Sequence, residues 1–246
     1  IMDGLKISLR KIIYAAFKKK LKNEIKVAQF SGYTSEHSGY HHGEASLNGA
    51  IVGMAQDYVG ANNINLLMPL GQFGTRLNGG KDSASERYIF TKLNPLTRMI
   101  YQTTDDQILK YLDDDGTPVE PIYYAPIIPM ILVNGTKGIG TGFSTEIMQH
   151  NPKDIITFIK NKLKDVENTV SIKPYYKGFK GEISEINKNK YLIRGCYNLV
   201  GDTKVQITEL PVGTWTDDYK AFLEKTIDSK DGMVSDYTDV GTDTTV

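Results

Sequence analysis

The chain has a single cysteine, Cys196, among its 246 residues. One cysteine cannot form an intrachain disulfide, so a disulfide framework is excluded and a reducing compartment is expected. The sequence also lacks an apolar run long enough to span a membrane. No basic region followed by an apolar run stands at the start, so we expect no signal peptide. We therefore expect an intracellular protein without a membrane partner.

The chain also lacks net charge, because 29 basic residues balance 29 acidic ones. The charges are unevenly distributed, however. Residues 1–30 carry eight basic residues against two acidic ones, whereas residues 202–246 carry four lysines against ten acidic residues. A basic N-terminal segment favours a polyanionic partner. For the lysines at 18–20, a solvated helix end is an equally good explanation.

The stretch from Gly79 to Tyr88, with the sequence GGKDSASERY, concentrates groups with chemical potential. Its two glycines allow a tight turn or the close approach of a ligand. Arg87 directly precedes Tyr88. An arginine can bind a phosphate through two parallel hydrogen bonds while a tyrosine hydroxyl attacks phosphorus. A loop leading into a strand explains the same residues without chemistry, so this stretch alone decides nothing.

Apolar spacing predicts helices over residues 8–22 and 47–58, with a loop around Gly32 between them. With the glycine loops that follow and a short strand over 88–93, these helices are typical of a winged-helix or helix-turn-helix unit. The later predictions are an acidic surface segment over 105–120, a buried apolar run over 126–133, a helix opening at Asn151-Pro152, strands near Ile183, Tyr191 and Val205, and a helix after Trp215. We expect an α+β fold with a domain boundary near Pro129. The last residues resemble an interrupted strand, which suggests a piece of a longer polypeptide.

Two histidines, His41 and His42, stand just before the second predicted helix. The N-terminus of a helix attracts phosphate, because its free N–H groups and its dipole favour negative charge. The pair is therefore a candidate phosphate site. The alternative is that the histidines only cap the helix.

A glycine-rich loop is predicted over residues 134–145, with Ile139 near its centre. The P-loop pattern is absent, because no Gly-Lys-Ser/Thr follows at the required spacing. Backbone N–H groups of such a loop can still bind phosphate. An exposed Ile139 would also suit a wedge between DNA base steps. The alternative is that Ile139 fills a place in the core.

Short motifs recur along almost the whole chain. They are DGLK at 3–6, KVAQ at 26–29, YHHGE at 40–44, FGTR at 73–76, GGKD at 79–82, RYI at 87–89, GIGTG at 138–142, YKGFKG at 176–181 and ELPVGTW at 209–215. In these motifs and their order, the chain resembles the DNA breakage-and-rejoining region of eukaryotic-type type IIA DNA topoisomerases. Each motif is weak alone, but so many in order leave little room for chance.

The resemblance implies roles for individual residues. Tyr88 would be the nucleophile that becomes linked to a 5′ phosphate of DNA, Arg87 would stabilise the transition state, and His42 would sit at the same phosphate. Ile139 would intercalate and bend the duplex. The other residues expected to contact DNA are Lys6, Arg10, Tyr40, His41, Ser46, Arg76, Lys81 and Trp215.

The resemblance also implies a winged-helix domain over 1–128 and part of a mixed α/β tower domain over 129–246. Mg²⁺ and ATP would serve the full-length enzyme, an ATP-hydrolysing type II topoisomerase, but would be bound outside this chain. The run Asp113–Asp115 is expected to be a solvated turn and not a metal site. The expected partners are double-stranded DNA and a second copy of the protein, since each chain would cut one strand. The site of action would be the nucleus, or a viral or cytoplasmic site of DNA processing.

Two other interpretations compete with a topoisomerase. One is a non-catalytic DNA-bending winged-helix protein, for which the basic first helix and Ile139 would suffice. The other is a structural scaffold whose catalytic site has decayed, and the intact Arg87, Tyr88 and His42 argue against it. Within the first interpretation, we expect the isolated chain to bind DNA weakly and not to cleave it.

Overall fold

The computed structural model describes residues 2–188, 190–229 and 233–246. The chain divides into two compact units. The first unit comprises Ile1–Asp57, Ala61–Phe73 and Ala84–Tyr175, and the second comprises Tyr58–Gly60, Gly74–Ser83 and Tyr176–Val246. This division falls after Tyr175, beyond the domain boundary predicted near Pro129. The division into winged-helix and tower domains stays a prediction.

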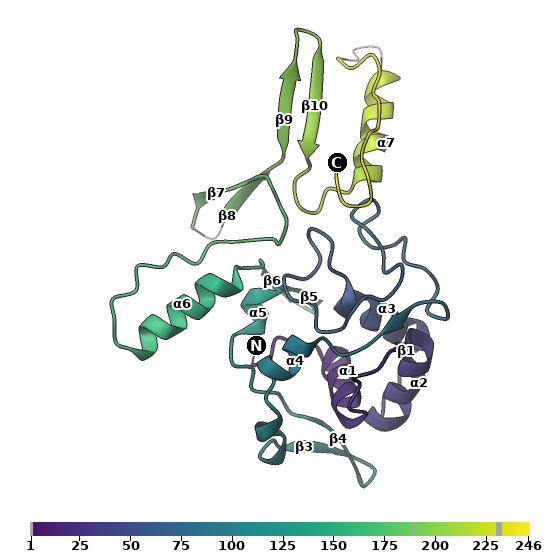
Figure 1. Ribbon diagram of the computed structural model, residues 1–246, viewed down its shortest axis with the longest axis vertical. Coiled ribbons are helices and arrows are strands. Elements are labelled where there is room, and N and C mark those ends of the chain that lie inside the picture. The colour runs from purple at the N-terminus through teal and green to yellow at the C-terminus, as the bar shows by residue number, and fades with distance from the viewer. Residues whose placement is uncertain (1, 189, 230–232) are drawn as a thin grey trace. The chain divides into compact units, whose positions relative to one another are not determined.

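Three helices make up much of the first unit: α1 Ile7–Lys18, α2 Val27–Ser38 and α3 Glu44–Ala55 (Figure 1). They pack against one another and bury a shared apolar core. Burial of one large aliphatic or aromatic side chain contributes about 1.5–3 kcal/mol, so this core holds the helices in place. Its most buried members include Ile12, Ile13, Phe30, Leu47 and Ile51.

The segment around Gly32 is helix α2, so the predicted loop was wrong. The inward side of this helix carries Ser31, Thr34 and Ser38, all buried. Their polarity hid the helical period from a search for apolar residues. Two of these hydroxyls are satisfied one turn back, since Thr34 Oγ1 donates to Phe30 O at 2.8 Å and Ser38 Oγ donates to Thr34 O at 2.6 Å.

The other two helices of this group were predicted with shifted ends. Helix α1 ends at Lys18, and Lys20 adopts a left-handed φ of 50° that no helix continues through. Leu21 is buried after the helix has ended, and its apolar character had lengthened the predicted helix. Helix α3 ends at Ala55, because Gln56 takes an extended backbone with φ −57° and ψ 136°.

The strand predicted over 88–93 is confirmed in a shorter form. Strand β2 Phe90–Thr91 pairs antiparallel with β1 Ile25–Lys26. Isolated bridges from Leu67 to Leu93 and from Leu70 to Phe90 continue the pairing on the other side. The backbone just after Tyr88 is therefore held from both sides.

The acidic segment 105–120 forms a hairpin on the first unit. It follows helix α4 Pro95–Ile100 and the 3-10 helix η1 Thr103–Gln107, and it consists of β3 Tyr111–Asp114 and β4 Thr117–Pro121. Strand β4 packs against α1. The aspartates form the turn, since Asp113 Oδ1 accepts a hydrogen bond from Gly116 N at 2.8 Å and Asp115 has a φ of 50°.

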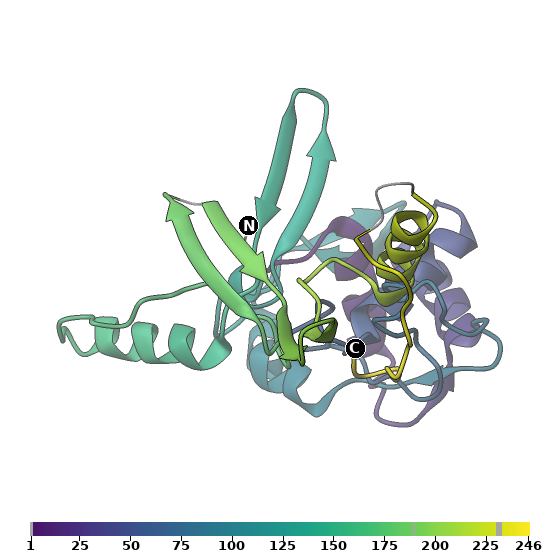
Figure 2. The same ribbon diagram turned by 90° about the horizontal axis from the view of Figure 1, so that it is seen from above.

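The apolar run 126–133 is buried only in part. Helix α5 Met130–Val133 buries both of its end residues, whereas Ile127 is exposed. The following glycine-rich loop is instead an antiparallel hairpin, β5 Thr136–Gly140 and β6 Phe143–Ile147. Figure 2 shows this hairpin (teal) extending away from the helices of the first unit.

Helix α6 Pro152–Leu163 begins where the Asn-Pro pair predicted. The Asn151 side chain accepts a hydrogen bond from Lys153 N at 2.9 Å, and Pro152 occupies the first turn, where no intrahelical donor is needed. Among the residues that the structure describes, none of the helices combines the length and the apolar character that spanning a membrane requires.

The second unit consists of two hairpins and a helix: β7 Glu182–Asn187 with β8 Lys190–Arg194, β9 Cys196–Val200 with β10 Lys204–Glu209, and α7 Thr216–Ile227. The three predicted strands and the last helix are confirmed. Strand β9 was missed, because none of its residues is buried and no alternation of burial marks it. Near the chain end Thr242 N donates to Thr245 O at 3.1 Å in a tight turn, where an interrupted strand was expected.

Candidate functional site

The Tyr88 side chain extends into solvent from a fixed backbone. Its phenol is 76% exposed, whereas the next residue, Ile89, is 2% exposed. Val27 N donates to Ile89 O at 3.0 Å and Ala28 N donates to Glu86 O at 3.1 Å, which ties both sides of Tyr88 to α2. Arg87 is exposed as well. The pair is therefore rigid in its backbone and open to a large substrate.

The residues of the YHHGE motif lie around the start of α3 in the same unit. Tyr40 is buried, and its ring meets that of His42 edge to face, with centroids 5.4 Å apart. His41 Nε2 lies 3.4 Å from Asp114 Oδ2 on strand β3. Gly43 is the N-cap and α3 has no side-chain cap, so the alternative in which the histidines cap this helix is wrong.

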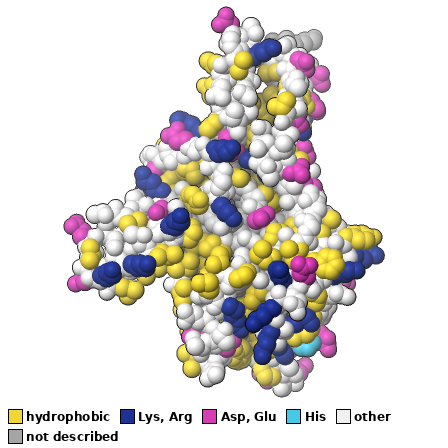
Figure 3. All heavy atoms as spheres, viewed as in Figure 1, with side chains coloured by type: hydrophobic (Ala, Val, Ile, Leu, Met, Phe, Trp, Pro, Cys, Tyr) yellow, Lys and Arg dark blue, Asp and Glu magenta, His cyan; other side chains and the backbone are white. Residues whose placement is uncertain are grey.

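His42 and Ser46 are both exposed at this end of α3. Tyr40 supports the imidazole of His42 from the core side, and the ring is thereby presented to solvent. Figure 3 shows Lys and Arg side chains gathered over the part of the first unit that holds α1, as expected from the basic N-terminal segment. A phosphate at this surface would meet exposed donors and positive charge.

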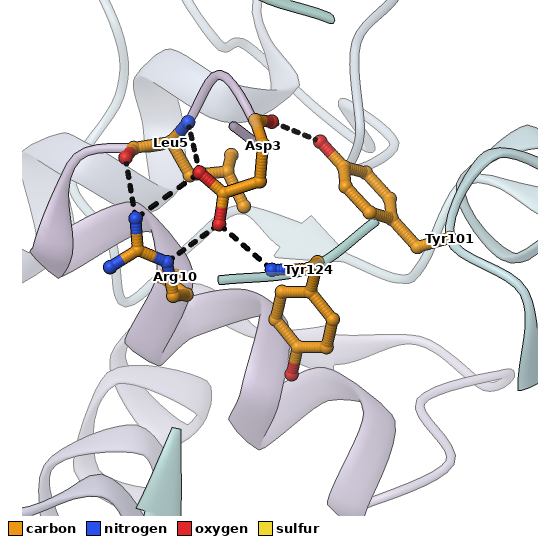
Figure 4. A network of polar contacts seen from close by, with 5 residues as sticks. All are labelled: Asp3, Leu5, Arg10, Tyr101 and Tyr124. Carbon is orange, nitrogen blue, oxygen red and sulfur yellow. Dashed lines mark hydrogen bonds and ion pairs between the residues drawn. The ribbon is translucent and has the colours of Figure 1, made fainter. Parts of the chain in front are cut away.

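Arg10, predicted to contact DNA, is engaged inside the fold (Figure 4). Its Nε donates to Asp3 Oδ2 at 2.6 Å and its Nη2 to Asp3 Oδ1 at 3.1 Å. The hydrogen bond to Asp3 raises the pKa of Arg10 above its ordinary value, against the opposing effect of burial. Asp3 is fully buried and also accepts from Tyr124 N and Leu5 N, each at 3.1 Å.

The same network explains the first motif, DGLK. Tyr101 Oη donates to Asp3 O at 2.9 Å, and burial raises the pKa of this phenol. Gly4 has a φ of +72°, and a Cβ there would lie 2.6 Å from Ile131 N, so only glycine fits. Lys6 then stands exposed at the N-cap of α1. The motif is a buried anchor that presents one lysine to solvent.

Arg76, also predicted to contact DNA, is buried in the second unit. Its side chain pairs with that of Glu209, with Arg76 Nη2 and Glu209 Oε1 2.5 Å apart, and the two residues are 5% and 3% exposed. Glu209 also accepts from Lys180 N at 3.2 Å and Leu210 N at 3.0 Å. This pair connects the FGTR, YKGFKG and ELPVGTW motifs, which the sequence alone could not show.

Trp215 packs on the glycine-rich loop of the second unit. Gly79 has a φ of +60°, and a Cβ there would lie 2.4 Å from the Trp215 indole. The close approach expected at this glycine is therefore to a side chain of the same unit. Tyr58 meets the other side of Trp215 edge to face at 5.9 Å, and burial, followed by the charge of Asp82, raises the pKa of Tyr58 to about 12. Lys81 is exposed in this loop.

Asp82 closes the same loop. Its carboxylate accepts from Thr75 N at 2.9 Å and from Thr75 Oγ1 at 2.6 Å. Burial acts to raise the pKa of Asp82, but these hydrogen bonds outweigh it and the pKa lies below the ordinary value. Sequence reasoning assigned Asp82 no structural role. An aspartate seven residues after a threonine in a glycine-rich loop was the available signal.

Ile139 stands on strand β5, and its side chain is 85% exposed. The alternative in which it fills the core is therefore wrong. Phe143, at the start of β6, is 84% exposed. An exposed apolar residue on a projecting hairpin has the placement that a wedge between base steps needs.

Within the described residues, no group of three or more His, Cys, Asp and Glu side chains could hold a metal ion. Asp113–Asp115 belongs to the β3–β4 turn, with Asp113 engaged by Gly116 N. The carboxylates described in this chain do not fit a Mg²⁺ site.

Comparison with known proteins places these features in a family. The DNA gyrase/topoisomerase IV family model matches residues 1–246. The chain belongs to this family. It is 54% identical to DNA topoisomerase 2 of Arabidopsis thaliana over 228 residues and 48% identical to DNA topoisomerase 2 top-2 of Caenorhabditis elegans over 250 aligned residues. These alignments cover 91% and 100% of this chain, but only 15% and 16% of the two relatives.

The structural likeness is equally close. A crystal structure of the Plasmodium falciparum topoisomerase II DNA-binding, cleavage and re-ligation domain matches the chain with a TM-score of 0.97 and 50% sequence identity. The match covers 100% of this chain and 34% of that one. The resemblance to eukaryotic-type topoisomerase II is thus confirmed, and the chain corresponds to the DNA-binding, cleavage and re-ligation region. The mixed α and β fold is confirmed with it.

Proposed function

We propose that this chain is the part of a type II DNA topoisomerase that breaks and rejoins duplex DNA through Tyr88. The main support is the combination of a 76% exposed phenol on a fixed backbone with a preceding exposed arginine, in a chain of this family. A tyrosine kept only for packing would be buried, as Tyr101 and Tyr124 are.

In the proposed reaction, the Tyr88 hydroxyl oxygen attacks a DNA phosphorus. The new bond joins Tyr88 to the 5′ phosphate, the bond from phosphorus to the neighbouring 3′ oxygen breaks, and that oxygen takes a proton. Arg87 stabilises the extra charge on the phosphoryl oxygens, and His42 donates a hydrogen bond to them or relays the phenolic proton. The ester formed resembles the one broken, so the 3′ hydroxyl can reverse the step and restore the strand.

The exposed members of the predicted contact set can meet a duplex without rearrangement. These are Lys6, His41, Ser46, Lys81 and Ile139. Tyr40 and Trp215 support such a surface by holding His42 and the Gly79 loop. Arg10 and Arg76 already bind Asp3 and Glu209, so we assign them to the stability of the two units.

The whole protein is proposed to contain parts that this chain does not supply. Residues 1–128 would be its winged-helix domain and 129–246 part of its tower domain. A homodimer would cut both strands of a duplex, and ATP and Mg²⁺ would be bound elsewhere in the polypeptide. Since no described cluster here fits a metal, the chain's own contribution is the nucleophile, the arginine and the DNA-binding surface. We propose a nuclear site of action, or a viral or cytoplasmic site of DNA processing.

The test is covalent capture in the full-length protein. Tyr88→Phe should abolish the protein–DNA adduct that survives denaturation and should change DNA affinity less than about twofold, because only the attacking oxygen is lost. Tyr123→Phe is a matched control, since Tyr123 is another exposed tyrosine of the first unit. An adduct retained by Tyr88→Phe would reassign the nucleophile. DNA bending without any adduct in the unaltered protein would favour the non-catalytic DNA-bending interpretation.

A further inference from the structure

The β5–β6 hairpin and the residue before it contain four glycines between 135 and 142, and the chain itself explains only two. Gly135 has a φ of +63°, and a Cβ there would lie 2.4 Å from Ile147 O. Gly142 has a φ of +79° in the turn. Only glycine adopts such conformations without strain.

Gly138 and Gly140 have no such reason. Neither has a left-handed φ, a Cβ at Gly138 would meet nothing within 4 Å, and one at Gly140 would meet only Phe143 O at 3.9 Å. Glycine weakens a strand, because it gains no packing and loses more conformational freedom than other residues. Within a strand it often marks a place where a ligand comes close to the backbone.

The register places these two glycines on one face of the ribbon. Directly opposite residues share a face, and faces alternate along a strand. The pairs Gly138–Thr145 and Gly140–Phe143 therefore lie on one face, which we call the glycine face, and the pairs Lys137–Glu146 and Ile139–Ser144 lie on the other. The ion pair between Lys137 and Glu146, at 3.5 Å, agrees with this assignment.

The glycine face is flat, uncharged and bordered by an exposed aromatic ring. Its side chains are Phe143 and Thr145, and Phe143 is almost as exposed as Ile139 on the opposite face. Figure 2 shows the ribbon projecting from the first unit, so neither face is covered by the helices of that unit. The tip thus carries one large apolar side chain on each face, although a single wedge would require only one.

We propose that the glycine face is a second DNA contact, on which a sugar–phosphate strand lies directly against the backbone of β5. This rests on the proposed function, in which Ile139 enters the duplex. A ribbon that enters a groove edge-on meets a wall on each side, and each wall is a sugar–phosphate strand. Gly138 and Gly140 admit one strand to van der Waals distance, the Phe143 ring packs on deoxyribose carbons, and the Thr145 hydroxyl donates to a phosphate oxygen.

The test uses the full-length protein and a duplex labelled at both ends, so that affinity and bend angle are measured together. The double variant Gly138→Ala with Gly140→Ala should bind about tenfold more weakly and bend less, because two methyl groups hold the strand away. Its melting temperature should be unchanged or higher, since both Cβ atoms enter open space. Gly32→Ala on α2, where a Cβ also meets nothing within 4 Å, is the matched control and should leave affinity unchanged.

Salt dependence identifies the type of contact. Phe143→Ala should also weaken binding about tenfold, yet leave the slope of log affinity against log salt unchanged, because it removes an apolar contact and no phosphate charge. Lys81→Ala should instead lower that slope by about one.

The outcomes separate this inference from the function on which it rests. If Ile139→Ala reduces bending while the glycine variants and Phe143→Ala match the unaltered protein, the glycine face is not a contact and the topoisomerase assignment stands. If the unaltered protein forms no covalent adduct, the proposed function fails first. Equal loss of affinity in Gly32→Ala would also overturn the inference, since the effect would not be specific to the hairpin.

Discussion

The Asp3 network and the Arg87–Tyr88 segment belong to the same unit, and both contain an arginine beside a group it could serve. In the first, the charge of Arg10 is neutralised by a buried carboxylate with four hydrogen bonds to its two oxygens. In the second, both side chains face solvent from a paired backbone. The difference shows that a charged motif stabilises the fold where its partner is internal, and is available for chemistry where the fold leaves it without one.

The largest effect is expected from Asp3→Ala, which breaks the internal arrangement. The change leaves the Arg10 guanidinium and the Tyr124 and Leu5 N–H groups without their acceptor. Removing one partner of a buried pair costs about 3–5 kcal/mol, and we expect the upper end for the free energy of unfolding of the first unit. Urea unfolding followed by circular dichroism measures it. A loss below about 1 kcal/mol would show that Asp3 is not an anchor.

Arg87→Ala probes the other side of the comparison. Loss of one preorganised charge at a transition state lowers a rate by about 10²–10³-fold, and we expect this for adduct formation in the full-length protein. The melting temperature should not change, because Arg87 is exposed. Quenched-flow measurement of the adduct gives the rate. Arg87→Lys should recover only part of it, since lysine cannot bind a phosphate with two parallel hydrogen bonds.

Arg76→Met asks whether a second arginine behaves like Arg10 or like Arg87. Because Arg76 is buried against Glu209, the free energy of unfolding should fall by about 3 kcal/mol, with a smaller effect on DNA affinity. Combining it with Glu209→Gln should recover part of the stability, since the amide needs no counter-charge. A large loss of DNA affinity at unchanged stability would return Arg76 to the DNA-binding set.

The smallest effect is expected from Tyr58→Phe, through its pH dependence. The folded pKa of Tyr58 is raised to about 12, above the value near 10 of an unfolded tyrosine. Its contribution is therefore constant below about pH 10 and is lost as the pH rises towards 12, because the unfolded chain ionises first. Urea unfolding at about pH 9 and about pH 11 should show a shallower decline in the variant. Tyr101 and Tyr124, whose pKa values burial also raises, provide the corresponding decline in the first unit.

Some of the fold could be predicted because its signal is local. Helix α6 was found from an N-cap asparagine followed by proline, and α1 from the spacing of Leu9, Ile12 and Ile13. Helix α2 was missed because its buried face consists of hydroxyl residues, whose partners are carbonyls of the same helix. A hydrophobic pattern detects what leaves water, and it cannot detect polar groups that are satisfied after burial.

The candidate site divides in the same way. Motif order alone identified the family, and it singled out Tyr88, Arg87 and His42 without any structural information. The exposure of Tyr88 and Ile139, the burial of Arg10 and Arg76, and the role of Gly79 against Trp215 depend on residues distant in sequence. No local pattern records such distant partners.

The sequence by itself determined which chemical groups this protein has and the family to which they belong, because those follow from residue identity and order. Only the tertiary structure decided which charges are neutralised inside and which face solvent. The reason is physical: the energy of a charge depends on its nearest partner and on its access to water, and the fold sets both.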